Sequence, residues 1–174
     1  MRALETVRLT LEPQVAAHAD EMFRVLSDPA IYEYENEPPD SAEWLRARFT
    51  RLESRRSPDG IERWLNWVLR DRSSALLGYV QATVYPEHRA GIAYVLASDS
   101  WGKGLASEAV ESMIAELAAR YGVRHLSAVL KRDNGRSMRL LERLGFSLAP
   151  AGLHAEREIE PDEALMLKSI EGSP

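Results

Sequence analysis

The stretch from residue 90 to residue 130 constrains the fold most, because it fixes how two strands lie against each other. The apolar run "AGIAYVLA" (90–97) predicts a strand, and a loop follows it. "RHLSAVL" (124–130) predicts a second strand, and Gly122 before it is typical of a helix C-terminal cap. A strand–helix–strand connection of this kind makes its two strands parallel neighbours in one sheet. The helix between them is indicated by apolar residues at helical spacing, namely Leu105, Ala109, Met113, Leu117 and Tyr121.

Further predicted strands and helices lie on both sides of this unit. Apolar runs predict strands over 6–11, 61–70, 75–84, 146–152 and 163–169, and periodic stripes with caps predict helices over 13–27, 41–56 and 134–144. The segment "DRSS" suits a hairpin turn, so the strands on either side of it are expected to be antiparallel. We therefore expect an α/β fold with one mixed sheet, in a single domain over residues 1–174.

Composition and charge exclude several classes of function. The chain has no cysteine, which rules out a disulfide framework and a cysteine nucleophile and fits a cytoplasmic location. Its formal net charge of −5 argues against non-specific binding to nucleic acid, which needs clustered Lys and Arg. No apolar run approaches the ~20 residues of a membrane span, and the N-terminus lacks the hydrophobic core of a secretory signal. The histidines have no partner at ligand spacing, so we expect no metal site.

The loop "SDSWGKG" (98–104) stands at the start of the predicted helix of residues 103–121. Helix N-termini bind anions through free N–H groups, and glycines such as Gly102 and Gly104 let the backbone approach a phosphate closely. A Walker loop does not fit, because Gly104 follows Lys103 where Ser or Thr is needed. The dinucleotide fingerprint does not fit either, because Ser107 replaces its third glycine. Taken alone, the loop suits either a phosphate site or an ordinary tight turn.

A second stretch, "NGRSMRLLERLGF" (134–146), narrows the choice. Together with "AYVLASDSWGKGLASEAV" (93–110), it resembles the GCN5-related N-acetyltransferases (GNAT), and more closely their RimJ/RimL-like branch. The segments "VRLTLEP" and "LSDPAIYEY" also look like that branch, so the resemblance covers nearly the whole chain. It implies the GNAT fold, a central, mostly antiparallel sheet splayed at a parallel strand pair, with about four helices. It also implies acetyl-CoA as the donor.

The resemblance further implies which residues hold this cofactor. The pantetheine is expected along the strand before the loop, beside Val95, Leu96 and Ala97. Asn134 and Ser137 are expected at the cofactor arm or thiol. Apart from the resemblance, Lys131, Arg132 and Arg136 are alternative candidates to bind the 3′-phosphate, chosen for their charge. The pyrophosphate is expected on the loop and helix start, at Trp101, Gly102, Lys103, Gly104, Leu105 and Ala106.

Two positions depart from the family pattern, and a third is expected to be structural. Asp99 stands where the general pattern has Gln or Arg. Leu141 stands where many members have the Tyr that protonates the leaving thiolate, which makes Ser137 the available hydroxyl for that role. Glu108 occupies the Glu of the motif, and we expect it to hold the loop backbone rather than to act in catalysis.

The implied reaction is direct attack of a neutral amine on the thioester, with no covalent enzyme intermediate. The site has to align the reactants, move two protons and stabilise the oxyanion, for which we expect a backbone N–H near Leu96 or Ala97. Each carboxylate or His considered as the base also suits a solvated surface charge. The candidates for the base are Glu62, which starts a central strand, and the alternatives Glu35, Glu37 and His88.

The acidic and aromatic loop "IYEYENEPPD" (31–40) is the candidate acceptor site. Tyr32, Tyr34 and Glu35 suit a cationic amine through ring faces and charge, and the alternative is a solvated acidic loop. The acceptor is either a protein N-terminus, as the branch suggests, or a small amine such as an amino acid, polyamine or drug. The same motifs also suit a non-catalytic acyl-CoA-binding sensor or interaction module, and the loop by itself suits a nucleotide-binding protein. A homodimer is compatible with the resemblance.

Overall fold

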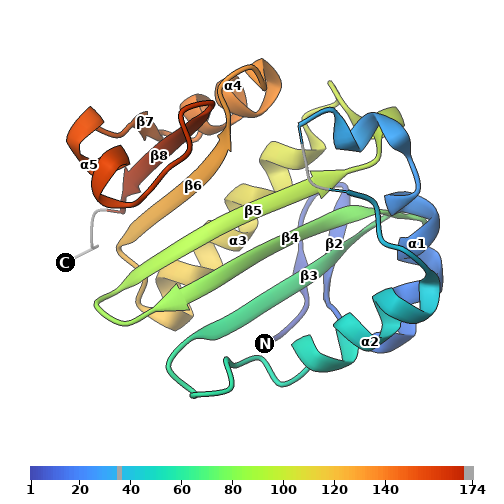
Figure 1. Ribbon diagram of the computed structural model, residues 1–174. Helices are drawn as coiled ribbons and strands as arrows, with labels where there is room; N and C mark the ends of the chain where they lie inside the picture. The colour runs from blue at the N-terminus through green and yellow to red at the C-terminus, as the bar shows by residue number, and fades with distance from the viewer. Residues whose placement is uncertain (35–36, 171–174) are drawn as a thin grey trace.

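The computed structural model describes residues 1–34 and 37–170, and in them eight strands form one sheet (Figure 1). The strand order is β1-β2-β3-β4-β5-β6-β8-β7. Neighbouring strands are antiparallel except β5 and β6, which confirms the mixed sheet with one parallel pair. The strands are β1 (Leu4–Glu5), β2 (Leu9–Pro13), β3 (Arg63–Asp71), β4 (Leu76–Tyr85), β5 (Arg89–Leu96), β6 (His125–Lys131), β7 (Ser147–Leu148) and β8 (Glu163–Ser169).

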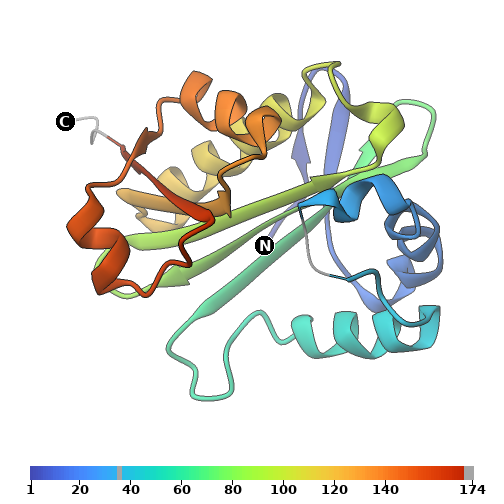
Figure 2. The ribbon, with the colours of Figure 1, turned by 45° about the horizontal axis from the view of Figure 1, so that its top comes forward.

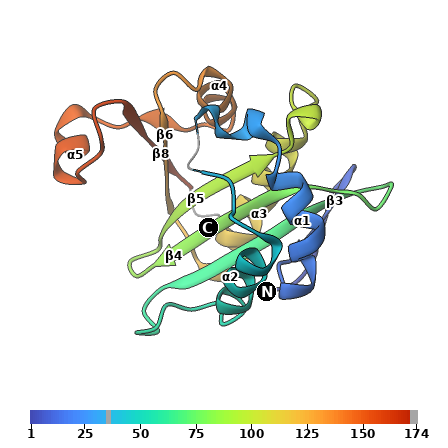
Figure 3. The same cartoon turned by 45° about the vertical axis from the view of Figure 1, so that its right-hand side comes forward.

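Helices cover both faces of the sheet, with α1 and α2 on one face and α3 on the other (Figures 2 and 3). The helices of the described residues are α1 (Ala19–Leu26), α2 (Ala42–Leu52), α3 (Leu105–Tyr121), α4 (Gly135–Arg143) and α5 (Ala151–Glu156). Short 3₁₀ helices, η1 (Ala16–His18), η2 (Pro29–Glu33) and η3 (Ser98–Ser100), join them to the strands. The predicted stripe of α3 supplies buried residues to the core, and Gly122 ends this helix at φ +67°.

The side-chain alternation of β3, β4 and β5 divides the core into two layers. Val80 and Ala82 on β4 pack toward α3, whereas Val68 and Val95 pack toward α1 and α2. Since both faces of these central strands are covered, their positions relative to one another are fixed by packing as well as by hydrogen bonds. The site described below lies at one end of these strands.

The parallel pair β5–β6 is short, and this opens the sheet. Its register joins residues 89–91 of β5 to residues 125–127 of β6 and then ends. β5 continues to pair with β4 as far as Leu96 opposite Gly78, while β6 pairs with β8 along its whole length. The two strands therefore diverge toward their C-terminal ends (Figure 1), as expected for a splayed parallel pair. Ligands in open α/β sheets bind at such carboxyl ends.

Two predicted elements differ in the structure. Pro13 does not open a helix but ends β2 opposite Trp67, because the next amide, of Gln14, bonds to the Asn66 carbonyl at 2.9 Å and prolongs the pairing. The strand expected over 146–152 is reduced to β7, and residues 151–156 form α5. There His154 Nε2 accepts the Leu165 amide at 3.0 Å, which holds α5 against β8.

Candidate functional site

A cavity of about 550 Å³ lies at the C-terminal end of β5, where β5 and β6 diverge. Its walls come from residues 94–96 of β5, the loop after β5, the first turn of α3 and one face of α4, with Ile31 and Tyr34 at one side. Among the residues expected to hold a cofactor, Ala97, Lys103, Lys131 and Arg132 do not line it. Those that do are Val95, Leu96, Trp101, Gly102, Gly104, Leu105, Ala106, Asn134, Arg136 and Ser137.

Backbone contacts explain why Ala97 and Lys103 lie outside this cavity. The Ala97 amide donates to the Leu77 carbonyl at 2.8 Å, so it continues the β4–β5 pairing. The Lys103 side chain is exposed, and its carbonyl accepts Arg8 Nη1 at 2.7 Å. Successive amides of a strand point to opposite edges, so the Leu96 N–H points away from β4, toward the edge of β5 from which β6 diverges.

The glycines of the loop have a backbone reason for their identity. Gly102 has φ +72° and Gly104 has φ +76°, a left-handed conformation that residues with a Cβ rarely adopt. Gly104 is also the N-cap of α3 and makes no side-chain cap hydrogen bond. The first amides of α3 therefore have no capping side chain at the cavity, which is the arrangement of an anion site at a helix N-terminus.

Trp101 joins the loop to the strand that precedes it. Its Nε1 donates to the Leu96 carbonyl at 2.9 Å. The Arg136 guanidinium lies over the indole, with Cζ 3.7 Å from the ring centroid. The same guanidinium pairs with Glu33 at 3.6 Å, so α4 and η2 meet beside the cavity. A hydrogen bond to Glu33 raises the pKa of Tyr34 above its ordinary value.

Three arginines of α4 add positive charge to the cavity wall. Arg136, Arg139 and Arg143 all line it. Asn134 sets the phase of this helix, because its Oδ1 accepts the Ser137 amide at 3.1 Å and fixes the first turn. With the N-terminus of α3 opposite, these side chains suit a ligand that carries several phosphates. From the sequence, the arginine spacing alone is more typical of a solvated helix face than of a binding site.

Glu108 holds the N-terminal segment and reaches the loop through Arg8. Its carboxylate accepts Thr6 Oγ1 at 2.6 Å and the Arg8 amide and Nε at 2.7 Å each. Burial alone would raise the pKa of Glu108, but the hydrogen bonds from Thr6 and Arg8 outweigh it and hold the pKa below its ordinary value. Since Arg8 also binds the Lys103 carbonyl, the contacts of Glu108 are structural.

Two hydroxyl-bearing residues lie where α4 meets β5. Ser137 lines the cavity, and the Tyr94 hydroxyl donates to the Ser137 carbonyl at 3.4 Å. Leu141, at the position of the usual family Tyr, is only 1% exposed and does not line the cavity. Sequence reasoning did not select Tyr94, although it stands within the strand motif "AYVLA".

The structure does not bring Glu62 to this cavity. Glu62 lies just before Arg63, the first residue of β3. Arg63 pairs with Val84 on β4, and Val84 in turn pairs with Ala90 at the start of β5. Ala90 is five residues from Val95 along β5, which is roughly 17 Å at ~3.3 Å per residue. Glu62 instead accepts Trp64 Nε1 at 2.9 Å. His88 is also remote, in the turn between β4 and β5, and Glu35 lies outside the described residues.

A second cavity of about 220 Å³ lies between the sheet and the helices α1 and α2. It shares Ile31 and Val95 with the first cavity, so the two meet at the splayed end of β5. Tyr32 lines this second cavity, whereas Tyr34 lines the first. Glu37 is the one carboxylate among the described residues that line either cavity.

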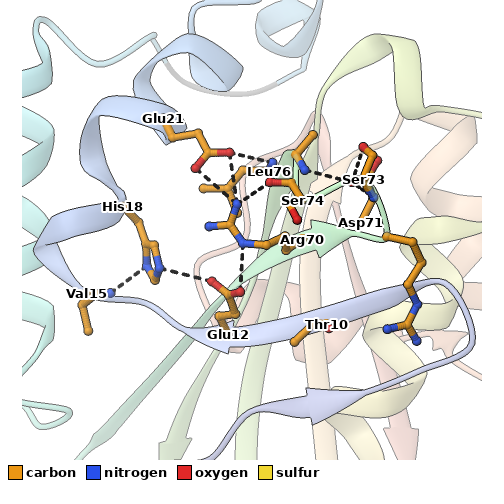
Figure 4. Close-up of polar contacts among 12 residues, drawn as sticks. Thr10, Glu12, Val15, His18, Glu21, Arg70, Asp71, Ser73, Ser74 and Leu76 are labelled. Atoms are coloured by element: carbon orange, nitrogen blue, oxygen red, sulfur yellow. Dashed lines mark hydrogen bonds and ion pairs between the residues drawn. The ribbon is translucent and has the colours of Figure 1, made fainter.

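A polar network holds the segment that leads into the second cavity (Figure 4). His18 Nδ1 accepts the Val15 amide at 3.1 Å, and its Nε2 lies 3.3 Å from Glu12. Arg70 donates from Nε to Glu12 at 2.8 Å and pairs with Glu21 at 3.2 Å. Burial lowers the pKa of His18 below its ordinary value, despite the opposing charge of Glu12. The network fixes β2, η1 and α1 beside the sheet.

The described part of the chain contains neither a metal cluster nor a membrane-spanning helix. No group of three or more His, Asp or Glu side chains there could hold a metal ion. No helix within the same residues is long and apolar enough to cross a membrane.

Comparisons with known proteins agree with this architecture. The profile of the Acetyltransferase (GNAT) domain family matches residues 8–147. An uncharacterized N-acetyltransferase p20 of Bacillus licheniformis is 27% identical over 148 residues, 84% of this chain and 83% of that protein. The uncharacterized N-acetyltransferase YoaA of Bacillus subtilis (strain 168) is 25% identical over 146 residues, 82% of this chain and 81% of that protein.

Solved structures share the whole fold at low sequence identity. RimL, a ribosomal L7/L12 alpha-N-protein acetyltransferase in complex with coenzyme A, superposes with a TM-score of 0.84 at 16% identity, covering 98% of this chain and 99% of that one. The ribosomal-protein-S5-alanine acetyltransferase of Vibrio fischeri gives 0.80 at 18% identity, covering 99% of each chain. With the family profile spanning most of the sequence, the chain belongs to the GNAT acetyltransferases and is an N-acetyltransferase.

Proposed function

We propose that acetyl-CoA occupies the first cavity and that a primary amine reaches its thioester through the second. The observation that carries this proposal is the shared wall, since Ile31 and Val95 line both cavities at the splayed end of β5. A cofactor and an acceptor that approach from opposite sides of this wall meet beside the backbone of residues 94–96. Such alignment supplies a large part of the rate enhancement in a two-substrate reaction.

The phosphates are assigned to the positively charged end of the first cavity. The amides at the start of α3, with Gly104, Leu105 and Ala106, bind the pyrophosphate. Arg139 and Arg143 have no ion-pair partner among the described residues and are available to further phosphate oxygens. Arg136 is preferred over Lys131 and Arg132 for such a role, because neither of these lines the cavity.

The thioester is assigned to the region between β5 and the start of α4. The Leu96 amide, on the splayed edge of β5, donates to the oxyanion that forms when the amine attacks. The leaving thiolate takes a proton from Tyr94 or Ser137, both of which line the cavity. We favour Tyr94 as the acid, because a phenol with a pKa of ~10 matches a thiol better than an aliphatic alcohol does.

The amine has to lose a proton before or during attack. Glu37 lines the second cavity and takes this proton in our proposal, directly or through water. Tyr32 stays assigned to the acceptor side because it lines the second cavity, whereas Tyr34 lines the first cavity, on the cofactor side of Ile31. The acceptor is an amine of a protein N-terminus or of a small molecule, and RimL and the S5-alanine acetyltransferase, whose folds are similar, are named for acting on ribosomal proteins.

Thiol release tests this proposal. Purified protein is incubated with acetyl-CoA and a panel of peptides and small amines, and free coenzyme A is measured with a thiol reagent. Release that depends on an amine, with the acetylated product seen by mass spectrometry, supports the proposal. Glu37→Gln should lower the rate most at low pH, where a base is needed most. Amine-dependent release that is the same in wild type and Glu37→Gln at every pH contradicts the role of Glu37.

A further inference from the structure

Three carboxamide side chains form a row across the floor of the second cavity. Asn66 on β3 is paired in register with Gln81 on β4. Gln14 follows β2, and its amide donates to the Asn66 carbonyl at 2.9 Å, which makes it the next residue in the same row. Register partners in a sheet point to the same face, and all three side chains line this cavity.

Gln14 is held firmly but has unused hydrogen-bonding capacity. Its backbone carbonyl accepts Arg55 Nη2, so both of its backbone polar groups are fixed. The residue is 3% exposed, and its Nε2 has no partner among the described residues. Buried polar groups are normally hydrogen-bonded, so an unpaired amide at a cavity points to a ligand. The terminal amide torsion is broad and lets either Nε2 or Oε1 face the cavity.

The charge of the cavity indicates what kind of ligand the row would take. The floor is neutral, and the charged residues among the described part of the lining are Glu37 and Arg48, both exposed. A polyamine needs several carboxylates, which this described lining lacks. Each carboxamide offers a donor and an acceptor, which is the complement of a neutral amide group.

The distance from the row to the thioester fits an amide close to the reacting amine. Gln81 is opposite Ala93 on β5, and Val95 lies two residues further along this strand. Two residues of a strand span roughly 7 Å, about the length of two extended peptide units. An amine beside Val95 therefore places the first amide groups of its own molecule over the row.

We propose that Gln14, Asn66 and Gln81 select acceptors in which the reacting amine is followed by a neutral amide. This inference rests on the proposed function, because it assigns the acceptor to the second cavity. The row is a specificity determinant, since it binds the acceptor rather than the reacting atoms. The ligand chemistry is shared by a peptide N-terminus and by a small amino amide, and the panel below separates these two sources.

The test compares acceptors that carry a primary amine on the same branched carbon. Each kcat/KM is expressed per unprotonated amine, because an α-amino group beside an amide ionises near pH ~8, well below an alkylamine at ~10.4. Alanyl-alanine amide, alaninamide, alanine and isopropylamine are each supplied with acetyl-CoA, and kcat/KM is taken from thiol release. The kcat/KM of the two amides should exceed that of isopropylamine and of alanine by at least about tenfold, because a site built for hydrogen bonds rejects analogues that lack them. A preference for alanyl-alanine amide over alaninamide indicates a peptide N-terminus, and equality indicates a small amino amide. Equal kcat/KM for amides and isopropylamine overturns the inference.

Variants test the assigned side chains. Gln81→Met and Gln14→Met keep side-chain length and remove the amide, and should lower the amide-to-isopropylamine ratio toward one by raising KM for amides. Thr83→Val is the control, half-buried on the same face of β4 but outside both cavities. Unchanged ratios in both Met variants overturn the inference. If Gln14→Met does not fold, the amide-to-isopropylamine ratio of Gln81→Met, compared with that of wild type, still tests the inference. Absence of transfer to any amine would instead refute the proposed function.

Discussion

The guanidinium of Arg136 stacks on the indole of Trp101, with Cζ 3.7 Å from the ring centroid. This contact joins α4 to the loop that precedes α3, on the wall of the first cavity. The same guanidinium also pairs with Glu33 at 3.6 Å, so it serves the ring, the carboxylate and, in our proposal, a phosphate. The strength of cofactor binding should therefore respond to all three groups.

Replacing Arg136 should weaken the binding of acetyl-CoA. We expect Arg136→Leu to raise the dissociation constant by about tenfold, the effect of losing one charge-assisted contact. Glu33→Gln removes the competing carboxylate and should leave binding equal or tighter. Arg132→Leu is the matched control, because Arg132 is exposed and bonds to the Pro161 carbonyl instead. Calorimetric titration measures all three, and an equal loss in Arg132→Leu would count against the assignment.

Gly104→Ala should impair both the loop and cofactor binding. At φ +76° a Cβ is strained, and the nearest side-chain atom is Arg8 Nη2 at 3.4 Å. We expect a loss of about 1 kcal/mol in the free energy of unfolding from the left-handed conformation, together with weaker acetyl-CoA binding. Gly152→Ala in α5 is the control, since it has open space and is not among the glycines with positive φ. Wild-type stability and binding in Gly104→Ala would refute the backbone argument.

Tyr94→Phe tests the acid. We expect kcat to fall by about a hundredfold while the dissociation constant of acetyl-CoA changes little, because the proton reaches the thiolate only during transfer. Ser137→Ala should have a smaller effect, and the basic limb of the pH–rate profile should be lost in Tyr94→Phe alone. If Ser137→Ala loses the basic limb and Tyr94→Phe keeps it, the roles are reversed.

The His18 network predicts a pH-dependent stability (Figure 4). Burial lowers the pKa of His18 below its ordinary value of 6.5. Protonation therefore favours the unfolded chain, so the full free energy of unfolding is present above pH 6.5 and declines as the pH falls below it. Urea unfolding at several pH values between 7.5 and 5 should show a smaller decline in His18→Gln. His125→Gln, at an exposed position, is the control, and equal declines in wild type and His18→Gln would contradict this account.

Much of the fold followed from local patterns. The apolar stripe of α3, its cap at Gly122 and the parallel strands on either side are set by residues near in sequence. The spacing of these residues was therefore enough to predict them. The helix start predicted at Pro13 was wrong, because proline suits both a helix start and a strand end. The pairing of Pro13 with Trp67, which the local sequence does not show, makes it a strand end. The short α5 depends on the contact of His154 with β8, which no local pattern reveals.

The cofactor side of the site was more predictable than the acceptor side. Ten of the residues named for the cofactor line the first cavity because they lie on one strand, one loop and two helix starts. Glu62 was chosen for its place on a central strand, but periodicity does not tell which end of that strand meets the cavity. The carboxamide row joins positions 14, 66 and 81, whose proximity exists only once the strands are in register.

In our proposal acetyl-CoA binds where α3 begins, so a larger side chain at that place should block its binding. Acetyl-CoA is titrated by calorimetry into wild type, Ala106→Leu and Ala119→Leu. Ala106 lines the cavity in the first turn of α3, whereas Ala119 is exposed near the other end of the same helix. We predict saturable one-to-one binding to wild type and Ala119→Leu, and at least a tenfold loss in a folded Ala106→Leu. Equal binding to all three proteins, or none to wild type, would contradict the account.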